Sequence, residues 1–357
     1  MDIALVIGTR PEFIQCTQVV RELNKHHNTQ IIHTGQHYDY IMNQIFFDEL
    51  QIPEPSCHLD IGSGSHGYQT GEMLKKIEVV LSDTHPDMVL VFGDTNSTLA
   101  GAISAAKLHI PVGHIEAGMR SFDRTMPEEI NRILTDHCSD ILFCSTKRPF
   151  SNLAHEGLTK NVFLTGDVTV DALRNYRKIA RRKSKILQDL SISPKEYMIA
   201  TIHRASNTDV KTNLKHIIEA LIASDKKIVV PLHPRTEAFL KKYNLFDKIN
   251  NCTNVITIPP LGYLDFLQLL SNAAKVLTDS GGIQKEAFIL KVPCITLRDN
   301  TEWVETVEEG WNILSGTDKK KITKMILDFS PSGNQCKVFG ENASKKITGL
   351  INTYQGH

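Results

Sequence analysis

Three acidic residues have positions from which a protein could transfer protons to or from a bound molecule. Asp94 and Glu116 follow the apolar runs MVLVF and IPVGHI, which are typical of buried parallel strands, so both side chains should emerge at the carboxyl ends of strands. Glu128 ends the segment TMPE, which has the spacing of a capping box and precedes apolar residues at helical period. We therefore expect Glu128 in the first turn of a helix, and all three carboxylates at one site.

Each acid alone also has a structural explanation. Acids at strand ends and helix starts often cap the following helix, and Glu128 in particular fits a capping residue. The concentration of the three acids in residues 93–132 is what favours a common site.

The first candidate anion site is the turn GTRPE, residues 8–12. It follows the first expected strand and opens a helix, but it lacks the pattern G-x-G-x-x-G, which disfavours a nicotinamide dinucleotide. Arg10 could supply the positive charge instead. The alternative is an exposed loop arginine.

A stronger anion-binding pattern comes later in the chain. Ser280, Gly281 and Gly282 follow an expected strand and open a helix, so their amides could bind a phosphate or diphosphate, and Glu286 could accept hydrogen bonds from ribose hydroxyls. A plain tight turn is the alternative reading. Two histidine-arginine segments end neighbouring expected strands, and they suggest proton exchange by His203 and phosphate binding by Arg235.

Short β-rich runs alternate with helical patterns along almost the whole chain, which predicts parallel sheets built from βα units. The expected strands of a first series are residues 2–8, 29–35, 88–94, 111–116, 141–145 and 161–165. Those of a second series are residues 197–203, 227–233, 254–259, 275–280, 293–298 and 312–315.

This alternation predicts an α/β protein with two Rossmann-like domains whose parallel sheets face each other across a cleft. Residues 1–168 would carry the carboxylates, and residues 169–338 the anion site. Residues 339–357 would form a C-terminal helix that packs back on the first domain. A nucleotide-sugar fits this division, because its diphosphate and its sugar need different groups.

The composition disfavours several classes of protein. With 40 basic and 40 acidic residues and a pI of about 7.2, the overall charge favours neither nucleic acid nor an anionic membrane. The seven cysteines include no C-x-x-C pair, and the 15 histidines include no metal-binding motif. The sequence shows no signal peptide and no apolar run of membrane-spanning length. We expect a cytoplasmic protein without a bound metal.

Together these segments resemble the non-hydrolysing UDP-N-acetylglucosamine 2-epimerases, which have the two-domain GT-B fold. The resemblance rests on GTRPE at Gly8, GQHYD at Gly35, GDTNSTLAGA at Gly93, HIEAGMRS at His114, PEEINR at Pro127, HR at His203, HPRT at His233 and TDSGGIQKEA at Thr278. It implies reversible inversion at C2 of UDP-N-acetylglucosamine, through departure and readdition of UDP and a 2-acetamidoglucal intermediate, without metal or other cofactor. It also implies a homodimer that supplies precursors of surface polysaccharides.

The resemblance also implies roles for individual residues. The catalytic groups of the family match Asp94, Glu116, Glu128 and His203. Its substrate contacts match Arg10, Ser280, Gly281, Gly282 and Glu286, with Phe266 as a candidate packing partner of the uracil.

The chain departs from the family pattern in four places. Gln15 stands where lysine is common, Ser206 replaces a glutamate, and Trp303 replaces an arginine on the substrate side. The segment GQHYD differs from the one that belongs to an allosteric UDP-N-acetylglucosamine site in bacterial members, so we do not expect that regulation.

Three alternatives to this reading stay open. GQHYD and the TEWVE segment around Trp303 resemble the branch that acts on UDP-2,3-diacetamido-2,3-dideoxyglucuronic acid, although the neutral Gln15 offers no cation for its carboxylate. A GT-B glycosyltransferase that uses a UDP-sugar and a non-catalytic nucleotide-sugar sensor are the others.

Overall fold

A computed structural model describes residues 1–35, 53–331 and 333–354. The chain forms two compact units, one made of Met1–Arg174 with the segment that begins at Lys337, and one made of Asn175–Cys336. The expected boundary after residue 168 falls at the start of α7 (Val168–Lys183), whereas the chain passes from one unit to the other inside that helix. The GQHYD motif lies outside the described residues except for its glycine.

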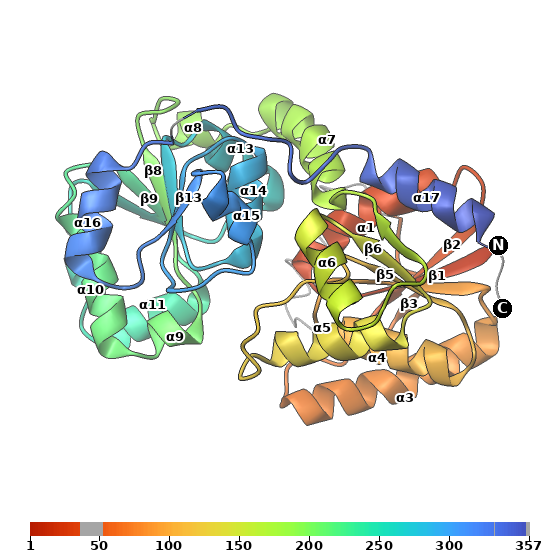
Figure 1. The fold of residues 1–357 in the computed structure, drawn as a ribbon. Coiled ribbons are helices and arrows are strands. Elements are labelled where there is room, and N and C mark those ends of the chain that lie inside the picture. The colour runs from red at the N-terminus through yellow and green to blue at the C-terminus, as the bar shows by residue number, and fades with distance from the viewer. Residues whose placement is uncertain (36–52, 332, 355–357) are drawn as a thin grey trace. The chain divides into compact units, whose positions relative to one another are not determined.

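The first unit contains a parallel sheet with the strand order β3-β2-β1-β4-β5-β6-β7. Its strands are β1 (Asp2–Ile7), β2 (Asn28–His33), β3 (Cys57–His58), β4 (Met88–Phe92), β5 (Val112–Ile115), β6 (Ile141–Cys144) and β7 (Val162–Leu164). Its helices are α1 (Arg10–Leu23), α3 (His66–Thr84), α4 (Asn96–Lys107), α5 (Pro127–Cys138), α6 (Lys147–His155) and α17 (Ala343–Thr353). In Figure 1, α3, α4 and α5 cover one face of this sheet, while α17 packs against α1 on the other.

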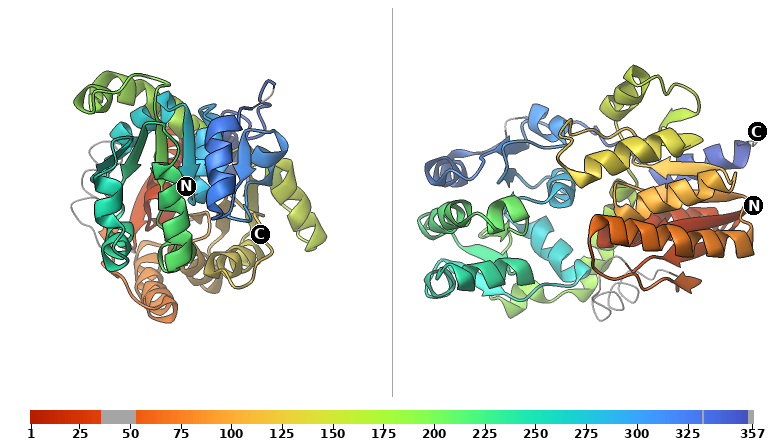
Figure 2. Two further views of the ribbon diagram at one scale, coloured as in Figure 1. Left: turned by 90° about the vertical axis from the view of Figure 1, so that its left-hand side faces the viewer. Right: turned by 90° about the horizontal axis from the view of Figure 1, so that it is seen from below.

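The second unit repeats this plan with the strand order β10-β9-β8-β11-β12-β13, again all parallel. Its strands are β8 (Met198–Thr201), β9 (Ile228–Pro231), β10 (Val255–Ile258), β11 (Lys275–Thr278), β12 (Cys294–Thr296) and β13 (Asn312–Leu314). Its helices, besides most of α7, are α8 (Ile186–Asp189), α9 (Ala205–Thr208), α10 (Lys211–Ile222), α11 (Pro234–Lys242), α12 (Phe246–Asn250), α13 (Tyr263–Asn272), α14 (Gly281–Ile289), α15 (Val304–Glu308) and α16 (Lys319–Asp328). Figure 2 shows helices on both sides of each sheet from two further directions.

Both sheets reverse their strand order at one point. The chain begins each sheet in the middle, at β1 or β8, builds outward on one side, and then returns to add β4 or β11 next to the first strand. In open α/β sheets ligands bind at the carboxyl ends of strands beside this reversal. We therefore expect ligand-binding residues in the turns after β1, β4 and β5 in the first unit, and in those after β8 and β11 in the second.

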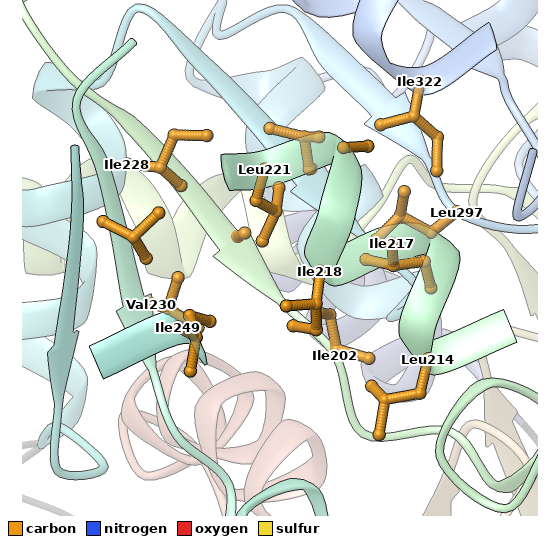
Figure 3. Close-up of a cluster of buried hydrophobic side chains, with 14 of the residues drawn as sticks. Ile202, Leu214, Ile217, Ile218, Leu221, Ile228, Val230, Ile249, Leu297 and Ile322 are labelled. Atoms are coloured by element: carbon orange, nitrogen blue, oxygen red, sulfur yellow. The ribbon is translucent and has the colours of Figure 1, made fainter. Parts of the chain in front are cut away.

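Helices on both faces explain why the strands are continuous apolar runs. All five residues of β4 are buried. In the second unit, Ile217, Ile218 and Leu221 of α10 belong to the same buried cluster as Ile228 and Val230 of β9 (Figure 3). This packing fixes the strand ends from which the candidate residues emerge.

Each strand expected from the sequence is present, although each is one to three residues shorter than expected. The short strand β3 was not predicted, because two residues cannot show an alternating pattern. No helix in the described part of the chain is both long and apolar enough to cross a membrane.

Candidate active site

Asp94 and Glu116 leave the first sheet at strand ends, as expected, and the structure shows that these two ends are neighbours. β4 and β5 are paired with Phe92 opposite Ile115, so the turns that follow them lie side by side. A Cβ atom placed on Gly93 would lie 3.9 Å from Oε2 of Glu116, so that carboxylate reaches the turn that carries Asp94. Glu116 itself has a φ of 74°, a left-handed conformation that costs a non-glycine residue of order 1–3 kcal/mol. Such strain is concentrated at functional sites.

A buried arginine holds Asp94 in place. Nε and Nη2 of Arg132, on α5, donate to Oδ2 of Asp94 at 3.0 and 2.5 Å, and Nη1 donates to Glu129 at 2.9 Å. The Arg132 side chain is 5% exposed, whereas that of Asp94 is 33% exposed and stays accessible to a substrate. The sequence had indicated no role for Arg132, although a buried arginine on a helix beside two acids requires such partners.

The predicted capping box at Glu128 is wrong. α5 begins at Pro127 with Met126 as its N-cap, and the Thr125 hydroxyl donates to Asp123 instead of capping the helix. Glu128 still lies in the first turn, as expected, and is only partly buried. A local structural role thus belongs to its neighbour Glu129.

Glu129 is buried and fixes the loop before α5. It accepts hydrogen bonds from the amides of Ser121 at 2.8 Å and Phe122 at 2.9 Å. Burial opposes its ionisation, but these amides and Arg132 hold the pKa of Glu129 below its ordinary value. Glu129 therefore offers Arg132 a stable negative charge and leaves Glu128 for other contacts.

Gln15 contacts a candidate catalytic residue directly. Its Nε2 atom donates to Oε2 of Glu116 at 2.5 Å, and the Gln15 side chain is buried. A neutral amide orients a carboxylate without the charge of the lysine that the resemblance implies at this position. The departure at position 15 thus acts on the carboxylate site.

The turn after β1 is occupied by the side chain of Glu12, which belongs to the helix α1 that follows the turn. The amides of Gly8 and Thr9 both donate to Oε2 of Glu12 at 2.7 Å, and the Thr95 hydroxyl donates to the other oxygen at 2.6 Å. Burial raises the pKa of Glu12, against the effect of these hydrogen bonds. The backbone of this turn is therefore occupied by a carboxylate where many Rossmann folds bind phosphate. Arg10 is the first residue of α1.

A second buried network supports the same strand ends. Nε2 of His114 contacts the Gly93 carbonyl at 2.8 Å, and Nδ1 contacts Asp136 at 2.7 Å. Asp136 in turn accepts from Arg120 at 2.7 Å, and Arg120 also pairs with Glu156. These contacts tie the turn before Asp94 to β5 and α5.

His33, at the end of β2, gives the first unit a measurable acid sensitivity. Its Nδ1 lies 3.2 Å from Nδ1 of His58, and burial, with the charge of His58, lowers the pKa of His33 to about 4 against the opposing effect of Asp60. Relative to an ordinary histidine, this leaves the free energy of unfolding unchanged above pH 6.5 and lowers it by about 3 kcal/mol as the pH falls towards 4. We expect the variant His33→Gln to lose less stability than the wild type between pH 7 and pH 4.5 in urea unfolding. Parallel losses in the two proteins would contradict this assignment.

In the second unit, His203 and the glycine turn follow the adjacent strands β8 and β11. The buried carboxylate of Asp279 connects them by accepting from the amides of His203 and Arg204 at 3.1 Å each, and from Asn207 at 3.0 Å. Burial lowers the pKa of His203, while the charge of Asp279 acts in the opposite direction. The sequence pattern had indicated no role for Asp279.

The glycine turn opens α14, as predicted. The helix starts at Gly281 with Ser280 at its N-cap position, and the Ser280 side chain does not cap it. The N-terminal amides of a helix attract anions, so this turn suits a phosphate. Two buried side chains flank it, since a Cβ atom on Gly281 would lie 2.1 Å from Glu302 and 3.5 Å from Nε1 of Trp303.

Charged groups surround this turn. Glu302 pairs with Arg298 at 2.9 Å and lies 3.8 Å from Arg204. The Lys285 ammonium lies 4.5 Å from the centre of the Trp303 ring, and both side chains are buried. Position 303, where the resemblance implies an arginine, is thus occupied by an indole that binds a neighbouring cation.

The second histidine-arginine segment has local partners. His233 is the N-cap of α11 and accepts from the Arg235 amide at 3.1 Å. The Arg235 guanidinium pairs with Asp209 at 2.5 Å and donates to Thr208 at 3.1 Å. An incoming phosphate would compete with Asp209 for Arg235, whose substrate contact stays a prediction.

Phe266 and Glu286 lie on neighbouring helices of the same unit, α13 and α14. Phe266 is 6% exposed and Glu286 is 9% exposed. The Tyr263 hydroxyl lies 3.4 Å from Oε1 of Glu286, and its ring packs edge-on against Tyr176. The contacts of Phe266 with uracil and of Glu286 with ribose stay predictions. Within residues 1–35, 53–331 and 333–354, no three His, Cys, Asp or Glu side chains are grouped as they would be around a metal ion.

Comparison with known proteins gives consistent matches over nearly the whole chain. The family model described as UDP-N-acetylglucosamine 2-epimerase matches residues 21–352. The chain is 56% identical over 354 residues to the UDP-N-acetylglucosamine 2-epimerase homolog of Methanococcus maripaludis, covering 98% of this chain and 99% of that protein. It is 45% identical over 332 residues to the UDP-2,3-diacetamido-2,3-dideoxy-D-glucuronate 2-epimerase of Pseudomonas aeruginosa, covering 91% of each.

A solved structure supports the same relationship. The crystal structure of Methanocaldococcus jannaschii UDP-GlcNAc 2-epimerase in complex with UDP-GlcNAc and UDP matches with a TM-score of 0.92 and 47% identity, over 99% of both chains. This likeness and the two parallel sheets confirm the predicted α/β fold of the GT-B type.

Proposed function

Because the chain belongs to the UDP-N-acetylglucosamine 2-epimerase family, we propose that it converts UDP-N-acetylglucosamine reversibly into UDP-N-acetylmannosamine without hydrolysis. The observation that carries the proposal is the pair of carboxylates, Asp94 and Glu116, at the paired strand ends of β4 and β5, with Glu128 in the first turn of α5. Epimerisation removes a proton from one face of C2 and returns one to the other face. Separate groups are needed for the two faces, and these residues supply them.

In the proposed reaction, a base of the first unit takes the C2 proton while the C1–O bond to UDP breaks. The electrons of the C2–H bond form the C1=C2 double bond of 2-acetamidoglucal, and UDP leaves with those of the C1–O bond. UDP then adds back to C1 as an acid protonates the opposite face of C2. Arg132 and Gln15 hold Asp94 and Glu116, so neither carboxylate has to reorient during catalysis.

The second unit, in this proposal, binds and stabilises UDP. The C2 proton is only weakly acidic, so the departure of a stabilised diphosphate must lower much of the barrier. Ser280, Gly281 and Gly282 bind the diphosphate, and losing one such preorganised donor typically lowers a rate by about 10²–10³-fold. His203 is the fourth catalytic group. The remaining substrate contacts are Arg10, Arg235, Phe266 and Glu286.

Incubation of the purified protein with UDP-N-acetylglucosamine alone tests the proposal. We expect UDP-N-acetylmannosamine to form without an acceptor, and in D2O we expect deuterium at C2 of both sugars, because the removed proton exchanges with solvent. Nuclear magnetic resonance of the mixture reads both results. Three outcomes would contradict the proposal. Formation of free N-acetylmannosamine with UDP would indicate hydrolysis. A requirement for an acceptor would favour a glycosyltransferase, and binding without turnover would favour a sensor.

A second candidate substrate for the same reaction is UDP-2,3-diacetamido-2,3-dideoxyglucuronic acid. The observation that favours it is the buried Lys285 over Trp303 beside the glycine turn, because a uronic acid needs a cation that Gln15 does not supply. The similarity to the Pseudomonas aeruginosa enzyme points the same way. Parallel incubations with the two sugars decide between them by the larger kcat/KM.

The family resemblance also supports proposals about the setting of the reaction. The protein would work as a cytoplasmic homodimer and provide precursors of surface polysaccharides. Sedimentation velocity tests the dimer against the chain mass of 40.1 kDa.

A further inference from the structure

Asp279 is a fully buried carboxylate that contacts the His203 ring as well as its backbone. Oδ1 lies 3.2 Å from Nδ1 of His203 and accepts from the His203 amide at 3.2 Å. Oδ2 accepts from the amides of His203 and Arg204 and from Nδ2 of Asn207, all within 3.1 Å. Both oxygens are therefore surrounded by N–H groups of the turn after β8.

The contact between Asp279 and the imidazole bears on which ring nitrogen carries a proton. Oδ1 of Asp279 lies 3.2 Å from Nδ1, and a carboxylate oxygen attracts an N–H group but repels a ring lone pair, so the contact favours the tautomer with its proton on Nδ1. In a neutral imidazole this leaves Nε2 without a proton and able to accept one. We propose that Asp279 is a positioning residue that holds His203 in this tautomer, with Nε2 as the atom that acts on the substrate; the catalytic part of this inference rests on the function proposed above.

The position of Asp279 in the chain strengthens this assignment. It directly precedes the turn Ser280–Gly282, so the residue that contacts the histidine is also the neighbour of the proposed diphosphate site. The charged and titratable groups that face the imidazole are Asp279, Arg204 and His233, whose ring centre lies 5.8 Å from that of His203. Burial favours the neutral ring, as a proton acceptor requires.

The variant Asp279→Asn separates positioning from simple structural support. If the asparagine oxygen keeps the contacts with Arg204 and Asn207, its NH2 group faces Nδ1 of His203 and forces the proton onto Nε2. Turnover should then fall by about 10²–10⁴-fold, the range for loss of a general base, while the affinity for UDP falls much less. Loss of the negative charge should also move the titration of His203 to lower pH.

Nitrogen-15 spectra of histidine-labelled protein read the tautomer directly, with His203 assigned by its absence in His203→Gln. We expect a protonated Nδ1 in the wild type and a protonated Nε2 in Asp279→Asn. Asn207→Ala is the matched control, because it removes a donor to Asp279 but keeps the carboxylate, and should keep the wild-type tautomer.

Three results would overturn the inference. The inference is wrong if His203 of the wild-type protein carries its proton on Nε2, and this result counts even if Asp279→Asn fails to fold. An unchanged tautomer in a folded Asp279→Asn overturns it as well, and a switched tautomer with full turnover removes the catalytic role. The tautomer is read without substrate, so failure of the proposed epimerisation would show separately, as absence of turnover in the wild type.

Discussion

Asp94→Asn is expected to lower the turnover of UDP-N-acetylglucosamine by about 10³-fold while leaving the affinity for UDP nearly unchanged. The asparagine oxygen can still accept from Arg132, which lies 2.5 Å from the carboxylate, so the local geometry is kept. The amide cannot take or return a proton, so the chemical step is lost. Steady-state turnover gives the first quantity and isothermal titration with UDP the second.

Asp83→Asn is a suitable control for this experiment. Asp83 is an exposed residue near the end of α3, and its replacement changes the overall charge by the same amount. It should turn over UDP-N-acetylglucosamine at the wild-type rate. Full activity of Asp94→Asn would remove Asp94 from the mechanism, whereas a lower melting temperature with loss of UDP binding would show that its role is structural.

The sequence allowed the fold to be predicted because buried parallel strands have a strong local pattern. β4 is apolar throughout its length, and β5 is buried throughout although it contains His114. Apolar residues recur at helical period after each strand, but in α5 Ile130 and Leu134 are exposed and the buried residues are polar. The positions of Asp94 and Glu116 followed from the same pattern, since strand ends need no long-range information. The pairing of β4 with β5, which brings the two acids together, depends on contacts distant in the chain and emerged only from the structure.

The error at Glu128 has a simple geometric cause. Successive residues of an α-helix are rotated by about 100°, so neighbouring residues face different directions. Placing the helix start one residue too early therefore assigns the inward-facing position to Glu128 when it belongs to Glu129. The sequence suggested Thr125 as the N-cap, whereas Met126 occupies that position and Glu129 faces inward. Capping boxes are realised in α1, where Glu12 accepts from the Thr9 amide, and in α4, where the Thr98 hydroxyl accepts from the Thr95 amide.

Arg132 and Asp279 were missed for a different reason. Each is defined by partners that lie far away in the chain, Asp94 for Arg132 and the turn at His203 for Asp279. Spacing within a motif identifies residues that contact a ligand more readily than the residues that support them. Buried charges are the signal, because each needs a partner, but burial of a single position is hard to read from one sequence.

The adjacent glycines of the diphosphate turn should respond in opposite ways to the same substitution. In Gly281→Ala, the new methyl group would lie 2.1 Å from Oε1 of Glu302, which is buried and paired with Arg298. Displacing Glu302 overpacks the region and disturbs a buried ion pair, at a cost of about 2–4 kcal/mol. We expect the melting temperature to fall by about 5–10 °C and UDP binding to weaken more than tenfold.

Gly282→Ala is the matched test of that explanation. Its methyl group would meet only the Ser280 hydroxyl at 3.9 Å, and alanine favours a helix over glycine by up to about 1 kcal/mol. Its melting temperature should therefore equal or exceed that of the wild type, as thermal unfolding of the three proteins would show. Equal stability of both variants would mean that Glu302 moves aside freely. In that case glycine would be required at both positions only because the diphosphate binds there. UDP affinity should then fall in both variants without any change in melting temperature.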